Sequence, residues 1–256
     1  MQLFHTFLYQ PLFNLLIFIY DVLPGADMGF AIIILTILIK LVLWPLANTS
    51  LRSQKALQDI QPKIEELKET YKDDKEKLAK AMMELYSKEK VNPLSSCFPL
   101  LIQLPILITL YRVLITGLNA ESLVNLYSFV PNPEIIHNFF LGFVDLTQPN
   151  IYLALLAGAF QFLQTRMLVS NRPEKKIRKK EGAKDEDMLA SMNKSMMYFM
   201  PVITVVIGAS LPGGLTLYWC TVNIFSVIQQ LIVFSRKEKK EKENGGTSLE
   251  TTKQIS

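Results

Sequence analysis

Acidic residues are missing from the most apolar parts of this 256-residue chain. No Asp or Glu occurs in 28–48, 92–118, 150–170 or 196–234. Proton- and sodium-coupled carriers commonly depend on carboxylates inside their spans, so this absence disfavours an ion-coupled transporter. The sequence also lacks a phosphate-binding glycine loop, and its two Cys and two His residues form no metal-ligand pattern. We therefore expect no enzyme, no cofactor and no metal site.

The apolar residues come in long blocks. Each of the four acid-free stretches is long enough to supply the roughly 20 apolar residues that a helix needs to cross hydrocarbon. The last is about twice that length, and Leu211-Pro212-Gly213-Gly214 breaks it in the middle, which indicates two spans joined by a tight turn. Because a bilayer core admits only helices or closed barrels, and the blocks do not alternate, we expect an all-α membrane protein with five transmembrane helices.

Lys and Arg are unevenly distributed along the chain. All but three of the 27 lie in 51–92, 171–194 and 236–256. Loops rich in Lys and Arg are the cytoplasmic ones. We therefore expect the N-terminus outside, the C-terminus in the cytoplasm, and a tail, 236–256, that is basic and disordered.

Residues 1–27 precede the first span. They are long enough to cross a membrane, but Gln2, His5, Gln10 and Asn14 interrupt the apolar run. We expect an external interfacial helix followed by a turn, with a sixth span as the alternative. The segment has no Lys or Arg, so charge does not decide between the two, and we expect no cleaved signal peptide.

The basic segment 51–92 has helical periodicity. Leu57, Ile60 and Ile64 begin one apolar stripe, a second follows near Leu85, and charged residues lie between the two. We expect a cytoplasmic helical hairpin, which is either a connector or a binding site for a partner. The other basic loop, 171–194, would contact anionic headgroups or ribosomal RNA.

Lys40 is the most informative residue, because it lies well inside the first predicted span. A charge at the centre of a span costs about 2.5–3.5 kcal/mol on insertion scales. The side chain either snorkels to headgroups or faces a wet cavity between helices. Further polar residues of the spans favour an enclosed polar pocket; they are Thr36, Gln103, Gln164, Thr216, Trp219 and Asn223.

Several motifs are distributed in order along nearly the whole chain. They are Gly29-Phe30-Ala31-Ile32-Ile33-Ile34, Lys40, Pro45-Leu46, Gln61-Pro62-Lys63-Ile64, Lys90-Val91-Asn92-Pro93-Leu94, Cys97-Phe98-Pro99-Leu100-Leu101-Ile102-Gln103-Leu104-Pro105, Phe199-Met200-Pro201-Val202, Leu211-Pro212-Gly213-Gly214-Leu215, Leu217-Tyr218-Trp219 and Ile228-Gln229-Gln230. In these motifs and their spacing the chain resembles the YidC/Oxa/Alb membrane protein insertase superfamily, most closely bacterial members without a large periplasmic domain.

The resemblance implies five core spans, here 28–235, around a hydrophilic groove that is open to the cytoplasm and to lipid and closed to the outside. The groove charge in the family is usually Arg, and Lys40 occupies the matching position without the planar fork of donors. Gln164 and Trp219 match groove-lining positions, and Thr36 and Tyr218 match positions near substrate. The resemblance also implies a bacterial cell membrane protein that moves short hydrophilic tails across the bilayer and apolar segments into it.

The partners that follow are nascent membrane proteins, the lipid bilayer and, through the hairpin and the basic tail, a ribosome or a Sec-type translocase. Two other functions stay open at this point. A small transporter or channel would need a continuous pore, and an assembly scaffold would hold membrane complexes together without translocating anything.

Overall fold

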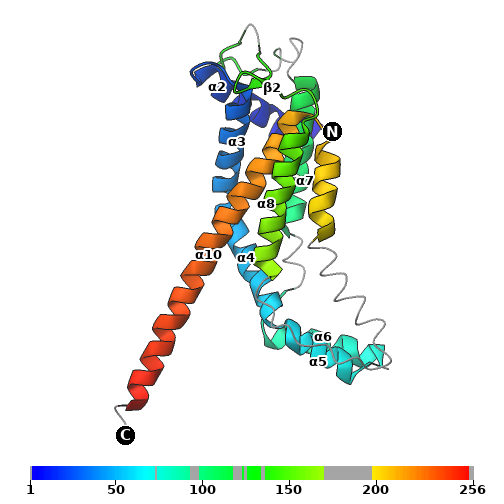
Figure 1. The fold of residues 1–256 in the computed structure, drawn as a ribbon, viewed down its shortest axis with the longest axis vertical. Helices are drawn as coiled ribbons and strands as arrows, with labels where there is room; N and C mark the ends of the chain where they lie inside the picture. The colour runs from blue at the N-terminus through cyan, green and yellow to red at the C-terminus, as the bar shows by residue number, and fades with distance from the viewer. Residues whose placement is uncertain are drawn as a thin grey trace.

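The computed structural model describes residues 2–72, 74–92, 98–117, 123, 126–133, 136–169 and 198–253. In this part of the chain long helices form an upright bundle (Figure 1). We call the end at which residues 126–133 and 136–149 lie the loop end. The opposite end, from which a pair of short helices projects, is the hairpin end.

The described elements are mostly helices, with two short strands. In chain order they are α1 (Gln2–Phe4), the π-helical turn η1 (His5–Tyr9), α2 (Gln10–Val22), α3 (Met28–Val42), α4 (Trp44–Asp59), α5 (Gln61–Thr70), α6 (Lys75–Lys88), α7 (Phe98–Arg112), the π-helical turn η3 (Val113–Gly117), β1 (Phe139–Phe140), β2 (Val144–Asp145), α8 (Ile151–Val169), a helix Tyr198–Gly208, and α10 (Gly213–Lys253).

The long helices are apolar enough for a membrane. Three of them qualify as spans by length and composition, namely Gln2–Val22, Ile151–Leu168 and Gly213–Ser235, and the pair α3 and α4 makes up to four. Leu101–Ile115 and Tyr198–Gly208 are apolar but shorter. The chain is therefore a multi-pass helical membrane protein, as the sequence predicted at that level.

The first predicted span, 28–48, is not a straight helix. The helix bends by 68° between Val42 and Trp44. Pro45 lies in the first turn of α4 and has no N–H to bond the carbonyl of residue 41, so the α3 hydrogen-bond ladder cannot continue through it. The apolar run thus gives way to a helix that leaves the bundle at the hairpin end.

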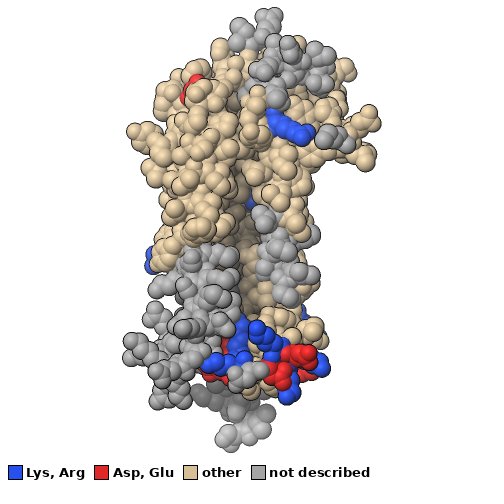
Figure 2. Space-filling view, turned by 90° about the vertical axis from the view of Figure 1, so that its right-hand side faces the viewer, with Lys and Arg blue, Asp and Glu red and all other residues tan. Residues whose placement is uncertain are grey.

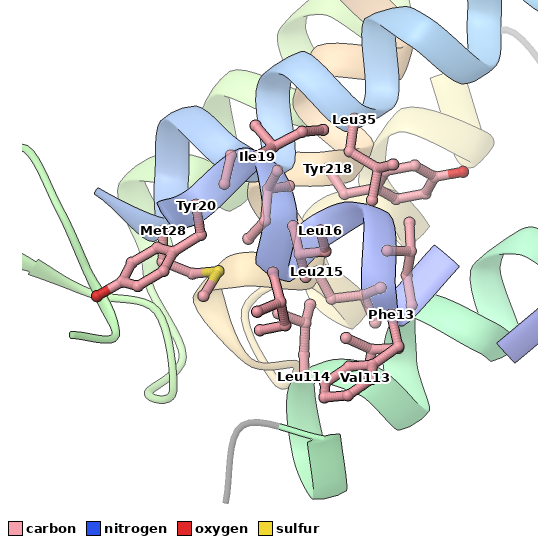
Figure 3. Packing of buried hydrophobic residues seen from close by; sticks show 14 of the residues in the cluster. Phe13, Leu16, Ile19, Tyr20, Met28, Leu35, Val113, Leu114, Leu215 and Tyr218 are labelled. Atoms are coloured by element: carbon pink, nitrogen blue, oxygen red, sulfur yellow. The ribbon is translucent and has the colours of Figure 1, made fainter. Parts of the chain in front are cut away.

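The hydrophobic core lies at the loop end of the bundle (Figure 3). One face of α2 enters it through Phe13, Leu16, Ile17 and Tyr20, which recur at helical spacing. Buried residues of α3, α7, η3 and α10 complete the cluster. Figure 1 shows α2 crossing over the end of the bundle instead of running along it.

Small residues allow α8 and the helix Tyr198–Gly208 to pack closely. A Cβ on Gly158 of α8 would lie 2.4 Å from Cγ2 of Val205 and 3.1 Å from the carbonyl oxygen of Pro201. Helix association in lipid relies on such close backbone approach. The helix Tyr198–Gly208 is therefore held against α8 by a site that only glycine fits.

The hairpin end carries α5 and α6, which lie side by side (Figure 1). Lys63, near the start of α5, forms an ion pair of 2.6 Å with Glu89, just after α6. The turn between them ends at Asp74, whose carboxylate caps α6 by accepting the N–H of Lys77. The two helices therefore run in opposite directions.

Two predicted segments have different outcomes. The basic loop 171–194 lies outside the described residues. The tail, for which composition favoured disorder, is helical in the structure, because α10 continues through Lys253. The Lys and Glu residues that follow position 236 are good helix formers, so the helix extends past its apolar part without a break.

Candidate functional site

The packed core ends at a similar depth on three helices. On α3 the buried residues run from Met28 to Thr36, and none of residues 37–42 is buried. On α7 none of 101–105 is buried, whereas Ile106, Thr109 and Leu110, nearer the loop end, are. On α8 no residue between 159 and 168 is buried. On the described parts of α3, α7 and α8 the side chains are therefore close-packed toward the loop end and more exposed toward the hairpin end, whereas α10 and α4 still have buried residues there, such as Gln230 and Ser50.

The surface is hollowed on one side. Figure 2 shows a furrow that runs between uncharged side chains in the upper half of this face, with a basic group visible deep inside it. Charged residues of both signs gather at the hairpin end of this face. The upper part of the bundle on this face is almost free of charge.

Lys40 lies one turn beyond Thr36, at the point where the packed core ends. Its side chain is half-buried, and no described residue forms an ion pair or hydrogen bond with it. The other two basic residues of the apolar helices, Arg112 and Arg166, are exposed. The Arg112 guanidinium lies 5.4 Å from the ring centre of Phe4 at the loop end. Lys40 is therefore the half-buried cation of the described spans.

The two candidate threonines are bonded within the structure. Thr36 is buried, and its hydroxyl donates to the carbonyl of Ile32 at 2.6 Å. Thr216 is fully buried, and its hydroxyl donates to the carbonyl of Gly208 at 2.9 Å. Thr216 thus ties the start of α10 to the preceding helix and faces packed side chains, not an open surface.

Gln103 and Tyr218 are brought together from helices distant in the sequence. The side-chain amide of Gln103 on α7 donates to the hydroxyl of Tyr218 on α10. Tyr218 is buried in the core cluster and Gln103 is half-buried at its edge. This polar pair therefore lies at the boundary between the packed core and the open part of the bundle.

Asn223 connects α10 to α8. Its side-chain amide donates to the carbonyl of Ala157 at 3.0 Å and to Oε1 of Gln161 at 3.2 Å. Trp219 lies one turn before Asn223 on the same face of α10, and both Trp219 and Gln164 are half-buried. Tyr218 lies on the neighbouring face, so the candidate residues of α10 point in two directions.

Some polar contacts were not predicted from the sequence. Gln161 was not a candidate, although it is the partner of Asn223. At the hairpin end, Gln229 donates to Oδ1 of Asn48 at 2.8 Å. Polar residues inside apolar runs are the only sequence signal for such bonds, and that signal does not show which residues pair.

Metal ligation has no candidate in the described part of the chain. No group of three or more His, Cys, Asp or Glu residues there is close enough to hold an ion. What the arrangement offers instead is the half-buried cation Lys40, on one of several apolar helices that carry no acid, namely α3, α7, α8 and α10 as far as Ser235, whereas α2 carries Asp21. Such a cation attracts anionic groups by charge, and polar groups beside it stay hydrated.

These features define a class of protein: a multi-pass helical membrane protein with a cation in a half-packed bundle. Comparison with known proteins identifies its family. The sequence model of the 60Kd inner membrane protein family matches residues 18–241, and the chain belongs to this family.

The chain is also similar to curated proteins. It is 39% identical over 205 residues to the membrane protein insertase YidC of Francisella philomiragia, and 40% identical over 205 residues to that of Francisella tularensis subsp. novicida. Each alignment covers 80% of this chain and 32% of the relative. The chain thus spans about a third of the length of these relatives.

Proposed function

We propose that the chain is a membrane protein insertase. Its family and its similarity to membrane protein insertases support this, at about 40% identity over most of the chain. The structural observation that carries the proposal is Lys40, a half-buried cation without a described partner at the level where close packing ends. An insertase needs a site within the membrane that accommodates the polar part of its substrate.

The proposed topology has five spans with the loop end outside. The spans are α3, α7 continued by η3, α8, the helix Tyr198–Gly208, and α10 to about Ser235. The basic segments at the hairpin end and the lack of Lys and Arg in 118–149 support this orientation. The location that follows is a bacterial cell membrane, with the C-terminus in the cytoplasm and residues 1–27 at the outer interface.

The mechanism we propose lowers the free-energy cost of moving a polar segment across the bilayer. A short hydrophilic tail cannot cross intact hydrocarbon readily, because each unsatisfied polar group costs several kcal/mol there. A hydrated groove from the hairpin end to the level of Lys40 shortens the dry path. Lys40 gives acidic groups a transient partner, while the apolar segment of the substrate moves sideways into lipid.

Other groove contacts are assigned by the same proposal. Four residues face or border the groove, namely Gln103, Gln164, Tyr218 and Trp219. The substrates are nascent membrane proteins. Three buried residues support the groove from behind: Thr36 bonds its own helix, and Thr216 and Asn223 bond neighbouring helices. The α5–α6 hairpin and the basic tail are the proposed docking points for a ribosome or a Sec-type translocase.

The first test compares Lys40→Arg, Lys40→Gln and Lys40→Glu in cells depleted of their own insertase. If charge attraction operates, Arg should rescue growth and insertion of substrates with acidic tails, Gln should rescue in part, and Glu should fail. Arg166→Glu serves as the matched control, because Arg166 is an exposed cation of a span. Equal rescue by Lys40→Glu and the wild type would overturn the role of Lys40.

The second test uses the purified chain in liposomes with a substrate that has a single span. Insertion without further proteins supports the proposed activity. Solute flux without insertion would point to a transporter or channel. Neither activity, in a sample that still binds membrane complexes, would point to an assembly scaffold.

A further inference from the structure

The N-terminal segment holds the loop end of the bundle by three side-chain bonds. Asn14 accepts the backbone N–H of Tyr127 at 2.6 Å, and Tyr20 accepts the N–H of His137 at 2.8 Å. Asp27 accepts the N–H of Leu141 at 2.6 Å. We call residues 126–133 and 136–149 the cap, and Asn14, Tyr20 and Asp27 the cap clamp.

Each member of the cap clamp is itself fixed. The amide of Asn14 donates to the carbonyl of Gln10, so its oxygen is aimed outward at the cap. Tyr20 is buried, and its hydroxyl points out of the core toward the loop ribbon (Figure 3). The second carboxylate oxygen of Asp27 caps α3 by accepting the N–H of Phe30 at 3.1 Å.

The cap needs this support near its tip. Leu141 has a positive φ of 54°, which is unfavourable for a residue with a side chain. The bond from its N–H to a charged carboxylate is among the stronger hydrogen bonds and offsets that strain. Next to it, a Cβ on Gly29 would lie 2.1 Å from Cδ2 of Phe140, so the cap rests directly on α3.

The other side of the cap is tied to α10. Gly213 donates its N–H to the carbonyl of Gln148 at 2.8 Å, and Gly214 donates to Leu146 at 2.9 Å. Leu146 and Val130 are buried members of the core cluster. The cap is therefore bound at the N-terminal segment, at α3 and at the start of α10, and it supplies part of the core.

The distance from the loop end to Lys40 indicates what the cap does. Lys40 follows Met28 by 12 residues, which at 1.5 Å per residue places it about 18 Å from the loop end. If the groove is hydrated to that level, the dry barrier is only about 60% of a 30 Å hydrocarbon core. Opening the cap would expose Tyr20, Met28 and Leu215 to external water and thin the barrier further.

We propose that Asn14, Tyr20 and Asp27 are positioning residues that hold the cap as a seal, which keeps the membrane tight to ions above a hydrated groove. The inference rests on the groove of the proposed function. It adds a separate property, because ion tightness is measured without any substrate.

The test measures two quantities on the full chain in liposomes. Hydrogen exchange of the amides of Tyr127, His137 and Leu141 reports opening of the cap, and a trapped pH dye reports proton leak under an imposed gradient. Loss of one bond should raise the open population up to about tenfold. Leak should rise in proportion to exchange, because both pass through the same open state.

The variants are chosen to keep the fold. Tyr20→Phe removes one hydroxyl, and Tyr9→Phe is its matched control, since Tyr9 is a buried tyrosine of the same segment whose hydroxyl has no bond to a described residue. Tyr20→Phe should speed exchange at His137 and raise leak, and Tyr9→Phe should do neither. Asp27→Asn, which keeps acceptor oxygen, should leak less than Asp27→Ala.

Each outcome of the test bears on a different claim: the seal, the clamp or the proposed function. Faster exchange without added leak would show a clamped loop that is not a seal and would overturn the inference. Unchanged exchange at His137 in Tyr20→Phe would overturn the clamp itself. If the wild type fails to insert a substrate, the proposed function fails, yet the leak of the variants against Tyr9→Phe still decides the seal.

Discussion

At the scale of single residues, the polar side chains of the spans differ in what they bond. Thr36 bonds its own helix, Gln103 and Tyr218 bond each other, and Asn223 bonds a neighbouring helix. Lys40 bonds no described residue. A buried polar group with a partner stabilises the bundle, whereas a half-buried cation without one is available to a ligand.

Asn223→Ala should destabilise the bundle by about 1 kcal/mol, the size of a typical hydrogen bond between helices in lipid. The variant loses the bonds to Ala157 and Gln161, which connect α10 to α8. Unfolding in mixed detergent micelles measures the change. Ser226→Ala is the control, because the Ser226 hydroxyl bonds only its own helix at Val222. Equal losses in the two variants would contradict a role for Asn223 between helices.

The sequence predicted which residues are polar inside the spans but not how they pair. Thr216 was a groove candidate, and its hydroxyl instead bonds Gly208 across the turn before α10. A threonine next to Pro212-Gly213-Gly214 is a turn residue as much as a span residue, and periodicity does not separate these roles. Lys40 was predicted to lie well inside a straight span, but it lies in the last turn of α3, two residues before the bend, and its depth in a bilayer stays a prediction.

At the scale of elements, backbone chemistry explains most departures from the predicted helices. The positions of the apolar runs followed from length and hydropathy, so the helical membrane class could be predicted. The bend after Val42 depends on Pro45, which the apolar run 28–48 contains but hydropathy ignores. The cap, 126–133 and 136–149, carried no periodicity, so its bonds to Asn14, Tyr20 and Asp27 could not be predicted.

Gly158→Ala should separate α8 from the helix Tyr198–Gly208. The added methyl would overlap Cγ2 of Val205, and overpacking of this kind costs about 1–3 kcal/mol. Adding Val205→Ala should restore part of the lost unfolding free energy, because it removes the overlapping atom. Ala159→Val, on the exposed side of α8, should change stability by under about 0.5 kcal/mol. No recovery in the double variant would contradict this packing.

The α5–α6 hairpin should loosen in acid. The bonded ammonium of Lys63 lowers the pKa of Glu89 below its usual range. The ion pair therefore stabilises the folded hairpin above the ordinary carboxyl pKa of about 4.3, and this contribution is lost as pH falls through the lowered value. Amide protection factors of α5 and α6 measure it, and the effect should be small because the pair is exposed.

The matching variant is Glu89→Gln, which should lower protection at neutral pH and remove most of the acid sensitivity. Glu84→Gln is the control, because Glu84 is an exposed residue of α6 with no ion pair to a described residue. High salt should act like Glu89→Gln, since at 1 M the screening length is about 3 Å. Acid sensitivity that persists in Glu89→Gln would assign the effect to another carboxylate, with Asp74 next in line.

At the scale of the whole molecule, the last helix connects the bundle to the hairpin. Trp44 of α4 packs edge-on against Phe225 of α10, with ring centres 5.7 Å apart. One turn on, Gln229 donates to Asn48. The ammonium of Lys55 then lies 4.8 Å from the ring centre of Phe234. We call these contacts the seam; they join α10 to α4, which leads into the hairpin, and we therefore expect a movement of the hairpin to shift the helix that carries Tyr218 and Trp219.

The seam should determine how rigidly the hairpin is held. A double-mutant cycle of Gln229→Ala and Asn48→Ala should give a coupling energy of about 1 kcal/mol. Each single variant should also broaden the distance distribution between spin labels on α6 and on the exposed face of α8. Gln54→Ala is the control, because the Gln54 amide bonds Ser50 within α4. Narrow distributions in all variants would mean that α4 positions the hairpin alone, and the proposed transmission along α10 would then be wrong.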